Sequence, residues 1–186
     1  MCQLELGFPE SALAAFQRAL PLAPTRSDEG TTFNNLSAIY RARPDVNAVV
    51  HCHTPSLIPF GVTDVRLRPM YHQAAFLAVG VPVFEIRQAA GMTNMLIETA
   101  PLGDALAKIL ADKPAVLMRG HGAVVVADTI PNVVGRSIYL EINARVQAQA
   151  IALGGPITAL TPEEAQKYAA SDNYARAWEL WKKKAR

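Results

Sequence analysis

The stretch 44–55, PDVNAVVHCHTP, sets two histidines one residue apart at the end of an apolar run. The segment 36–43 before it, LSAIYRAR, has the spacing of a helix, which a proline and an aspartate then end. Residues 46–50 are rich in β-branched side chains, which favour a strand. The stretch therefore predicts a helix, a tight turn and a strand, with His51 and His53 at the C-terminal end of the strand.

Strand and helix patterns of both kinds follow along the chain, without an internal repeat. The longest helical pattern is 131–153, for which Asp128 or Thr129 is the expected cap. The sequence Thr-Pro-Glu-Glu at 161–164 predicts the capped start of another helix. The other expected strands are 56–60, 81–86, 115–118 and 123–126, and the other expected helices are 9–20, 73–79, 102–111 and 174–184. These helices are enough to cover a central sheet, so we expect a mixed α/β fold.

The composition fits a single domain that spans 1–186. With 186 residues, 51% of them hydrophobic, the chain can bury one sizeable core. The net charge of +2 comes from interspersed charges, and the only basic cluster, 182–186, is typical of a solvated helix end. No window approaches the roughly 18 apolar residues that a membrane span needs. We therefore expect a soluble protein that has neither nucleic acid nor a membrane as its partner.

The cysteines and the N-terminus indicate the cellular setting. Cys2 and Cys52 are the only cysteines and form no disulfide framework. Glu5 and Glu10 interrupt the apolar stretches at the N-terminus, which therefore lacks the pattern of a signal peptide. We expect a reduced, cytoplasmic setting.

The two neighbouring histidines have the spacing of metal ligands. Side chains alternate along a strand, so His51 and His53 point to one face and Cys52 points to the other, where we expect it to be buried. Their Cα atoms would lie roughly 7 Å apart, which allows both imidazoles to bind one ion. The sequence Arg119-Gly120-His121-Gly122, between two expected strands, offers His121 as a third ligand.

The alternative to a metal site is that the two histidines have no special role, because a His-X-His pair on a strand is often ordinary polar surface or core. If the three imidazoles do bind an ion, they leave an open position that suits a catalytic divalent metal. Zinc is the first candidate, and manganese, cobalt, magnesium or iron are the others.

The two segments that carry the histidines resemble those of a known family. RARPDVNAVVHCHTP, followed about 70 residues later by MRGHGAVVV, is similar to the class II aldolase/adducin family over about 39–160. The resemblance implies a three-layer α/β/α fold with a mainly antiparallel central sheet. It also implies a homotetramer with sites at subunit interfaces, and it assigns metal binding to His51, His53 and His121. The segment 161–186 would form C-terminal helices.

Within the family, 58–77, 81–96 and 176–185 resemble a decarboxylase-like branch that includes dihydroxyphthalate decarboxylases. His72 stands where family aldolases have an active-site aromatic residue, which makes it a candidate catalytic proton donor or a residue that holds the substrate. The alternative is a structural histidine at the start of a helix, with its hydrogen bonds satisfied. Tyr71 is a candidate substrate contact or a packing residue. Arg119 can bind a substrate carboxylate or form a structural salt bridge.

The N-terminal part departs from the family pattern. Family members have an acidic residue 19 positions before the first motif histidine, where this chain has Thr32. Asp28 or Glu29 would have to supply a carboxylate from a shifted loop. The phosphate-binding Gly-Asn-X-Ser loop is absent from 1–38, which we interpret as a divergent segment that arose by truncation, a misplaced start or a frameshift.

The resemblance implies a divalent-metal-dependent carbon–carbon lyase, first a decarboxylase of a hydroxylated, aromatic carboxylic acid. The metal would stabilise the carbanion that carbon–carbon cleavage leaves. The alternatives are a sugar-phosphate aldolase or epimerase, a non-catalytic adducin-like assembly module, and an iron-dependent oxygenase on the same scaffold. The substrate would be a small hydroxy acid or a sugar phosphate.

Overall fold

A computed structural model of the protein describes residues 2–6, 37–169 and 174–184. Residues 37–42 are helical and precede the second strand in the chain. The strands are β1 (Cys2–Leu6), β2 (Ala48–Cys52), β3 (Val83–Phe84), β4 (Ala115–Met118) and β5 (Gly122–Ala127). The helices are η2 (Pro55–Leu57), α3 (Ile58–Val62), η3 (His72–Val79), α4 (Ile86–Ala90), α5 (Ala100–Leu110), α6 (Ile130–Leu153), α7 (Pro162–Ala169) and α8 (Ala175–Lys184), with η marking 3-10 helices.

The strands form one sheet in the order β1-β2-β5-β4-β3. The pairs β1–β2, β2–β5 and β4–β5 are antiparallel, and only β3–β4 is parallel. The expectation of a mainly antiparallel sheet is therefore confirmed. Every residue of β4 and β5 is buried, which explains why these segments are uninterrupted apolar runs rather than alternating ones.

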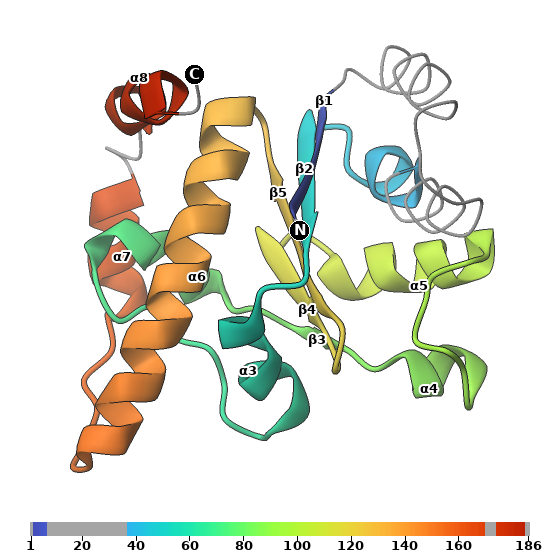
Figure 1. Ribbon diagram of the computed structural model, residues 1–186, viewed down its shortest axis with the longest axis horizontal. Helices are drawn as coiled ribbons and strands as arrows, with labels where there is room; N and C mark the ends of the chain where they lie inside the picture. The colour runs from blue at the N-terminus through green and yellow to red at the C-terminus, as the bar shows by residue number, and fades with distance from the viewer. Residues whose placement is uncertain (1, 7–36, 170–173, 185–186) are drawn as a thin grey trace.

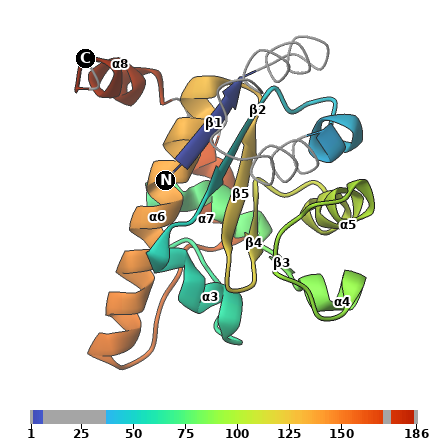
Figure 2. The same ribbon diagram turned by 45° about the vertical axis from the view of Figure 1, so that its right-hand side comes forward.

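Two apolar clusters cover the two faces of the sheet. Val49, Val124 and Val126 pack on one face with the helix 37–42 and α5. Val50, Cys52 and Val125 pack on the opposite face with η3 and α6. Figures 1 and 2 show the sheet between α5 and α4 on one side and α6, α7 and α3 on the other. The three-layer α/β/α fold is thus confirmed, and so is the burial of Cys52.

Local sequence signals place the long helices well. The helix expected at 131–153 is α6, with Thr129 at its N-cap, although no side chain bonds to the cap amides. At the start of α7, the Thr161 hydroxyl accepts the amide of Glu164, whose carboxylate accepts the amide of Thr161. These two bonds form the expected capping box. Among the described helices, none has the length and apolar character needed to cross a membrane.

The strand expected at 56–60 is wrong. This segment forms the 3-10 helix η2 and the short helix α3 instead. Pro55 and Pro59 stand in the first turns of these helices, where a missing amide hydrogen costs nothing. The strand expected at 81–86 is shorter, because Pro82 precedes β3 and Ile86 already starts α4. The helix expected at 9–20 lies outside the described residues.

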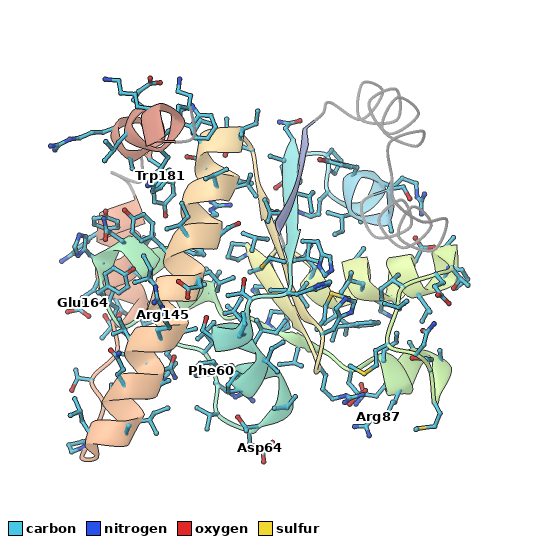
Figure 3. All side chains as sticks on the ribbon, viewed as in Figure 1. Phe60, Asp64, Arg87, Arg145, Glu164 and Trp181 are labelled. Carbon is cyan, nitrogen blue, oxygen red and sulfur yellow. The ribbon has the colours of Figure 1, made fainter. Side chains whose placement is uncertain are left out.

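Aromatic contacts hold α8 against α6. The ring of Tyr139 on α6 stacks on Tyr174, with 5.6 Å between the ring centroids, and lies 6.1 Å from Trp181 of α8. A Cβ at Gly135 would overlap the Tyr174 ring, so this glycine makes the space into which the ring fits. Figure 3 shows Trp181 on the side of α8 that faces α6 and α7.

Candidate metal centre

The strand β2 positions the first two histidines. His51 pairs with Val124 of β5 and shares the α5 face of the sheet with Val49. His53 follows one residue after the end of β2 and is exposed. Because side chains alternate along the strand, both rings extend from the same face, as the His-X-His spacing predicts.

The third histidine lies in the tight turn between β4 and β5. The amide of His121 donates to the Met118 carbonyl at 3.0 Å, and Gly120 takes the left-handed conformation with φ +63°. A Cβ at Gly122 would overlap the Cys52 carbonyl oxygen and lie 3.2 Å from His53 Cα. The absence of a side chain at 122 therefore allows the turn to approach the end of β2, which brings His121 beside His53.

The three imidazoles converge through their Nε2 atoms. His53 Nε2 lies 3.0 Å from His51 Nε2 and 2.9 Å from His121 Nε2. One nitrogen from each ring can be chosen so that all lie within 4.8 Å of one another. Two ligand atoms on a tetrahedral zinc ion are about 3.3 Å apart, given metal–nitrogen distances of about 2.0–2.1 Å. The two separations from His53 are slightly shorter than this and the whole set lies within 4.8 Å, so the spacing fits a shared ion after a small adjustment of the rings.

Backbone carbonyls set the orientation of two of the rings. His51 Nδ1 lies 3.0 Å from the Ala123 carbonyl, and His121 Nδ1 lies 3.0 Å from the Met95 carbonyl. A carbonyl only accepts, so each Nδ1 carries the proton and each Nε2 of the neutral ring is left as an acceptor. Two such acceptors facing His53 favour a cation between them. The same arrangement orients histidines in known metal sites.

Burial keeps these rings in the form that binds metal. Desolvation, followed by the nearby His121 and His53, lowers the pKa of His51 from 6.5 to about 4. Desolvation and His53 likewise lower the pKa of His121. Both rings are therefore neutral at neutral pH, as metal ligands must be. Three imidazole ligands, of which His53 is exposed, leave at least one position open for a substrate oxygen.

Arg119 forms an ion pair beside the histidine cluster. Its Nε lies 2.6 Å from Glu85 Oε2, and the same carboxylate contacts Arg87 Nη2 at 2.6 Å. Hydrogen bonds from Arg87, and then the contact with Arg119, lower the pKa of Glu85 to about 2. Glu85 also caps α4 by accepting the amide of Arg87. Figure 3 shows Arg87 beside α4. This geometry supports the structural-salt-bridge interpretation of Arg119.

Tyr71 and His72 lie in the opposite layer. Tyr71 and the residues of η3 pack in the cluster on the α6 face of the sheet, whereas His51 extends from the α5 face. The exposed His72 ring contacts Tyr168 of α7, with 5.0 Å between centroids. Tyr71 Oη has no hydrogen-bond partner within the described chain, and burial raises its pKa to about 12. A single chain therefore does not bring these two residues to the three histidines.

Two buried amides of α6 fix the chain that leads to Tyr71. Asn143 bonds the Met70 amide and the Arg68 carbonyl, each at 2.8 Å. Gln147 bonds the Arg68 amide and the Arg66 carbonyl, also at 2.8 Å. Because α6 thus serves as the pairing partner of a segment without regular structure, the place of Tyr71 and His72 on this face is firmly determined.

Sequence reasoning missed two residues around the centre. Glu85 holds Arg119, and Met95 supplies the carbonyl that His121 bonds. Nothing in the local sequence distinguishes Met95, whereas Arg87 two residues after Glu85 could have indicated an ion pair. Thr32, Asp28 and Glu29 lie outside the described residues. Within the described chain, no carboxylate joins the histidine group.

Known proteins resemble this chain in sequence and in fold. The family described as Class II Aldolase and Adducin N-terminal domain matches residues 27–148. The decarboxylase tropJ of Talaromyces stipitatus is 32% identical over 78% of this chain and 63% of its own length. The 3,4-dihydroxyphthalate decarboxylase of Rhodococcus jostii is 34% identical over 63% of this chain and 47% of its own length. The chain spans about half to two thirds of these curated relatives.

Among solved structures, the L-fuculose 1-phosphate aldolase from Glaciozyma antarctica is 25% identical and superposes with a TM-score of 0.59. The similarity covers 74% of this chain and 49% of that enzyme. The expected resemblance to decarboxylases is confirmed by the sequence relatives, while the expected fold is confirmed by the superposition.

Proposed function

Because the chain belongs to the class II aldolase and adducin family, we propose that it is a divalent-metal-dependent carbon–carbon lyase. The reaction proposed is loss of carbon dioxide from a hydroxylated, aromatic carboxylic acid. The observation that carries this proposal is the convergence of three Nε2 atoms on one point. The names of two relatives, both decarboxylases, support the choice of reaction.

The ligand set favours zinc. Three neutral imidazoles are typical of zinc and other borderline ions, whereas magnesium prefers oxygen ligands. When bound, the ion would supply Lewis-acid stabilisation of negative charge on the substrate. Manganese, cobalt and iron remain candidates with the same ligands.

In the proposed reaction the bond between the ring carbon and the carboxyl carbon breaks, and carbon dioxide leaves. The electron pair stays on the ring carbon, which must then receive a proton. His72 is the proposed donor, and its imidazole would be reprotonated from water. Tyr71, whose raised pKa keeps its hydroxyl protonated, would contact the substrate beside it.

His72 would act across an interface between two copies of the chain. Its position in the α6 layer, away from the histidine cluster in its own chain, supports this arrangement. The proposal therefore includes a homo-oligomer, a tetramer by family resemblance, in which one copy supplies the metal ligands and its neighbour the proton donor. Arg119 would hold the substrate carboxylate only by sharing its guanidinium with Glu85.

A mixing experiment tests the shared site. His53→Ala and His72→Ala chains, each inactive by itself, should regain activity when they are unfolded together and refolded as mixed oligomers. Mixed oligomers that remain inactive, although each parent chain still assembles, would contradict the assignment of His72 to a neighbouring site.

The reaction itself is tested by carbon dioxide release. Zinc-loaded protein is incubated with dihydroxybenzoic and dihydroxyphthalic acids, with His53→Ala as the matched control. Release by the unmodified chain and not by the variant supports the proposal. Cleavage of sugar phosphates alone would replace it by an aldolase, which the similarity to the fuculose phosphate aldolase favours as the second candidate. Metal binding without either activity would favour an assembly module.

A further inference from the structure

The third histidine depends on a distant turn for its orientation. His121 Nδ1 bonds the carbonyl of Met95, 26 residues earlier in the chain, at 3.0 Å. His51, by contrast, bonds the Ala123 carbonyl of the strand that is paired with its own strand. The sheet therefore fixes the acceptor for His51, whereas the acceptor for His121 is only as well placed as the turn that carries it.

That turn has an unusual backbone conformation. Met95 has φ +71°, a left-handed conformation that costs free energy for a residue with a side chain. The Thr93 hydroxyl accepts the Met95 amide at 3.0 Å, and the Asn94 side chain accepts the Leu96 amide at 3.0 Å. Both side chains bond the backbone two residues on and so stabilise the turn.

The turn is attached to the core on one side and to the histidine loop on the other. Ile97, directly after it, is fully buried in the cluster on the α5 face. The Met95 side chain lies over the turn of His121, since a Cβ at Gly120 would be 2.9 Å from Met95 Cε. The position of the Met95 carbonyl is thus defined by the buried Ile97 and by the bond that the Met95 amide donates to the Thr93 hydroxyl.

We propose that Thr93 is a positioning residue for the metal centre. By holding Met95 in its left-handed conformation, the Thr93 hydroxyl directs the Met95 carbonyl at His121 Nδ1. That bond keeps the proton on Nδ1 and directs Nε2 at the shared ion. The inference rests on the proposed metal-dependent function, and it adds that metal affinity depends on a hydroxyl that touches neither the ion nor any ligand histidine.

Zinc affinity provides the first test. The metal-free chain is titrated in competition with a chromophoric zinc chelator. Loss of a group that orients a ligand histidine typically weakens metal affinity by about 10–100-fold, and we expect this for Thr93→Val. Thr93→Ser keeps the hydroxyl and should remain within about twofold of the unmodified chain. Thr99→Val is the matched control, because Thr99 is exposed and makes no side-chain cap bond.

A rescue separates positioning from a general loss of stability. Glycine adopts the left-handed conformation without strain, so Met95→Gly should make the Thr93 hydroxyl dispensable. The double variant Thr93→Val with Met95→Gly should therefore recover zinc affinity to within about threefold of the unmodified chain. A Thr93→Val chain with unchanged affinity would overturn the inference. So would equal losses in Thr93→Val and Thr93→Ser, or a double variant as weak as the single one.

A measurement without metal distinguishes this inference from the proposed function. In the metal-free protein, the Nδ1 proton of His121 should give a downfield proton NMR signal, assigned by its loss in His121→Asn. The signal should persist in Thr93→Ser and disappear in Thr93→Val. Its persistence in Thr93→Val overturns the positioning role whether or not the chain binds zinc. Its disappearance in a chain that binds no zinc would support the positioning role and reject the metal-dependent function.

Discussion

The two faces of the central sheet carry different parts of the predicted site. On the α5 face, His51, His53 and His121 converge within hydrogen-bond distance. On the α6 face, Tyr71 and His72 pack among aromatic rings instead. Strand alternation and a tight turn thus bring the histidines together within one chain, whereas Tyr71 and His72 would reach such a cluster only in the proposed contact between copies of the chain.

The largest expected effect is on zinc affinity, when one histidine on each face is replaced by alanine in turn. His121→Ala removes one of three proposed ligands and should weaken zinc binding at least about 100-fold. His72→Ala should leave zinc affinity unchanged, because its ring contacts Tyr168 on the other face. Zinc titration of both variants shows whether zinc binding depends on the α5 face alone. Equal losses in the two variants would show that the faces are not independent.

The next effect concerns the close approach of the β4–β5 turn to β2. Gly122→Ala places a methyl group against the Cys52 carbonyl. We expect the free energy of unfolding to fall by up to about 3 kcal/mol and the zinc affinity to fall as well. Gly61→Ala is the control, since its Cβ would meet atoms no nearer than 3.6 Å. Chemical unfolding of the metal-free chains measures the free energy of unfolding, and zinc titration measures the affinity. An unchanged Gly122→Ala protein would contradict the steric argument.

The pH dependence of the metal-free protein has a defined sign. The pKa of His51 is about 4 in the folded chain, below the ordinary 6.5 of an unfolded histidine. The unfolded chain therefore binds more protons between these values, so stability is lost as the pH falls from about 6.5 to about 4. His51 should contribute about 3 kcal/mol to this loss. Urea unfolding across this range should show the loss, and His51→Asn should flatten it.

The smallest effect lies on the α6 face. Thr161→Ala removes the hydroxyl that accepts the Glu164 amide at the start of α7. Loss of such a cap costs about 1 kcal/mol. Because α7 carries Tyr168, the change should loosen the surroundings of His72 without altering zinc affinity. Thermal unfolding and zinc titration together test this. A weakened zinc affinity would indicate that the α6 face supports the metal centre after all.

The sequence was sufficient where local chemistry determines structure. The strands β4 and β5, the helix α6 and the capping box of α7 all follow from apolar runs, length and cap residues. His51 and His53 were predicted from strand alternation, which is a local rule, and His121 from the Gly-His-Gly segment between two expected strands. The segment 56–60 was predicted wrongly, since an apolar run does not by itself distinguish a strand from a helix that starts with proline.

The parts that sequence reasoning missed are joined over long distances. Glu85 meets Arg119, and the Met95 carbonyl meets His121, only after the chain has folded. A backbone carbonyl carries no signal in the identity of its residue, so Met95 could not be recognised as a partner. The sequence placed Tyr71 and His72 in the candidate site by resemblance alone, and their face of the sheet follows from the bonds that Asn143 and Gln147 make.

We propose that His51, His53 and His121 hold a divalent metal ion. Elemental analysis of protein purified without chelator tests it most directly. The unmodified chain should contain about one equivalent of metal per chain, and His53→Ala less than about a tenth. Less than about a tenth of an equivalent in the unmodified chain, with no uptake of added zinc, would contradict the metal centre and the proposed lyase with it.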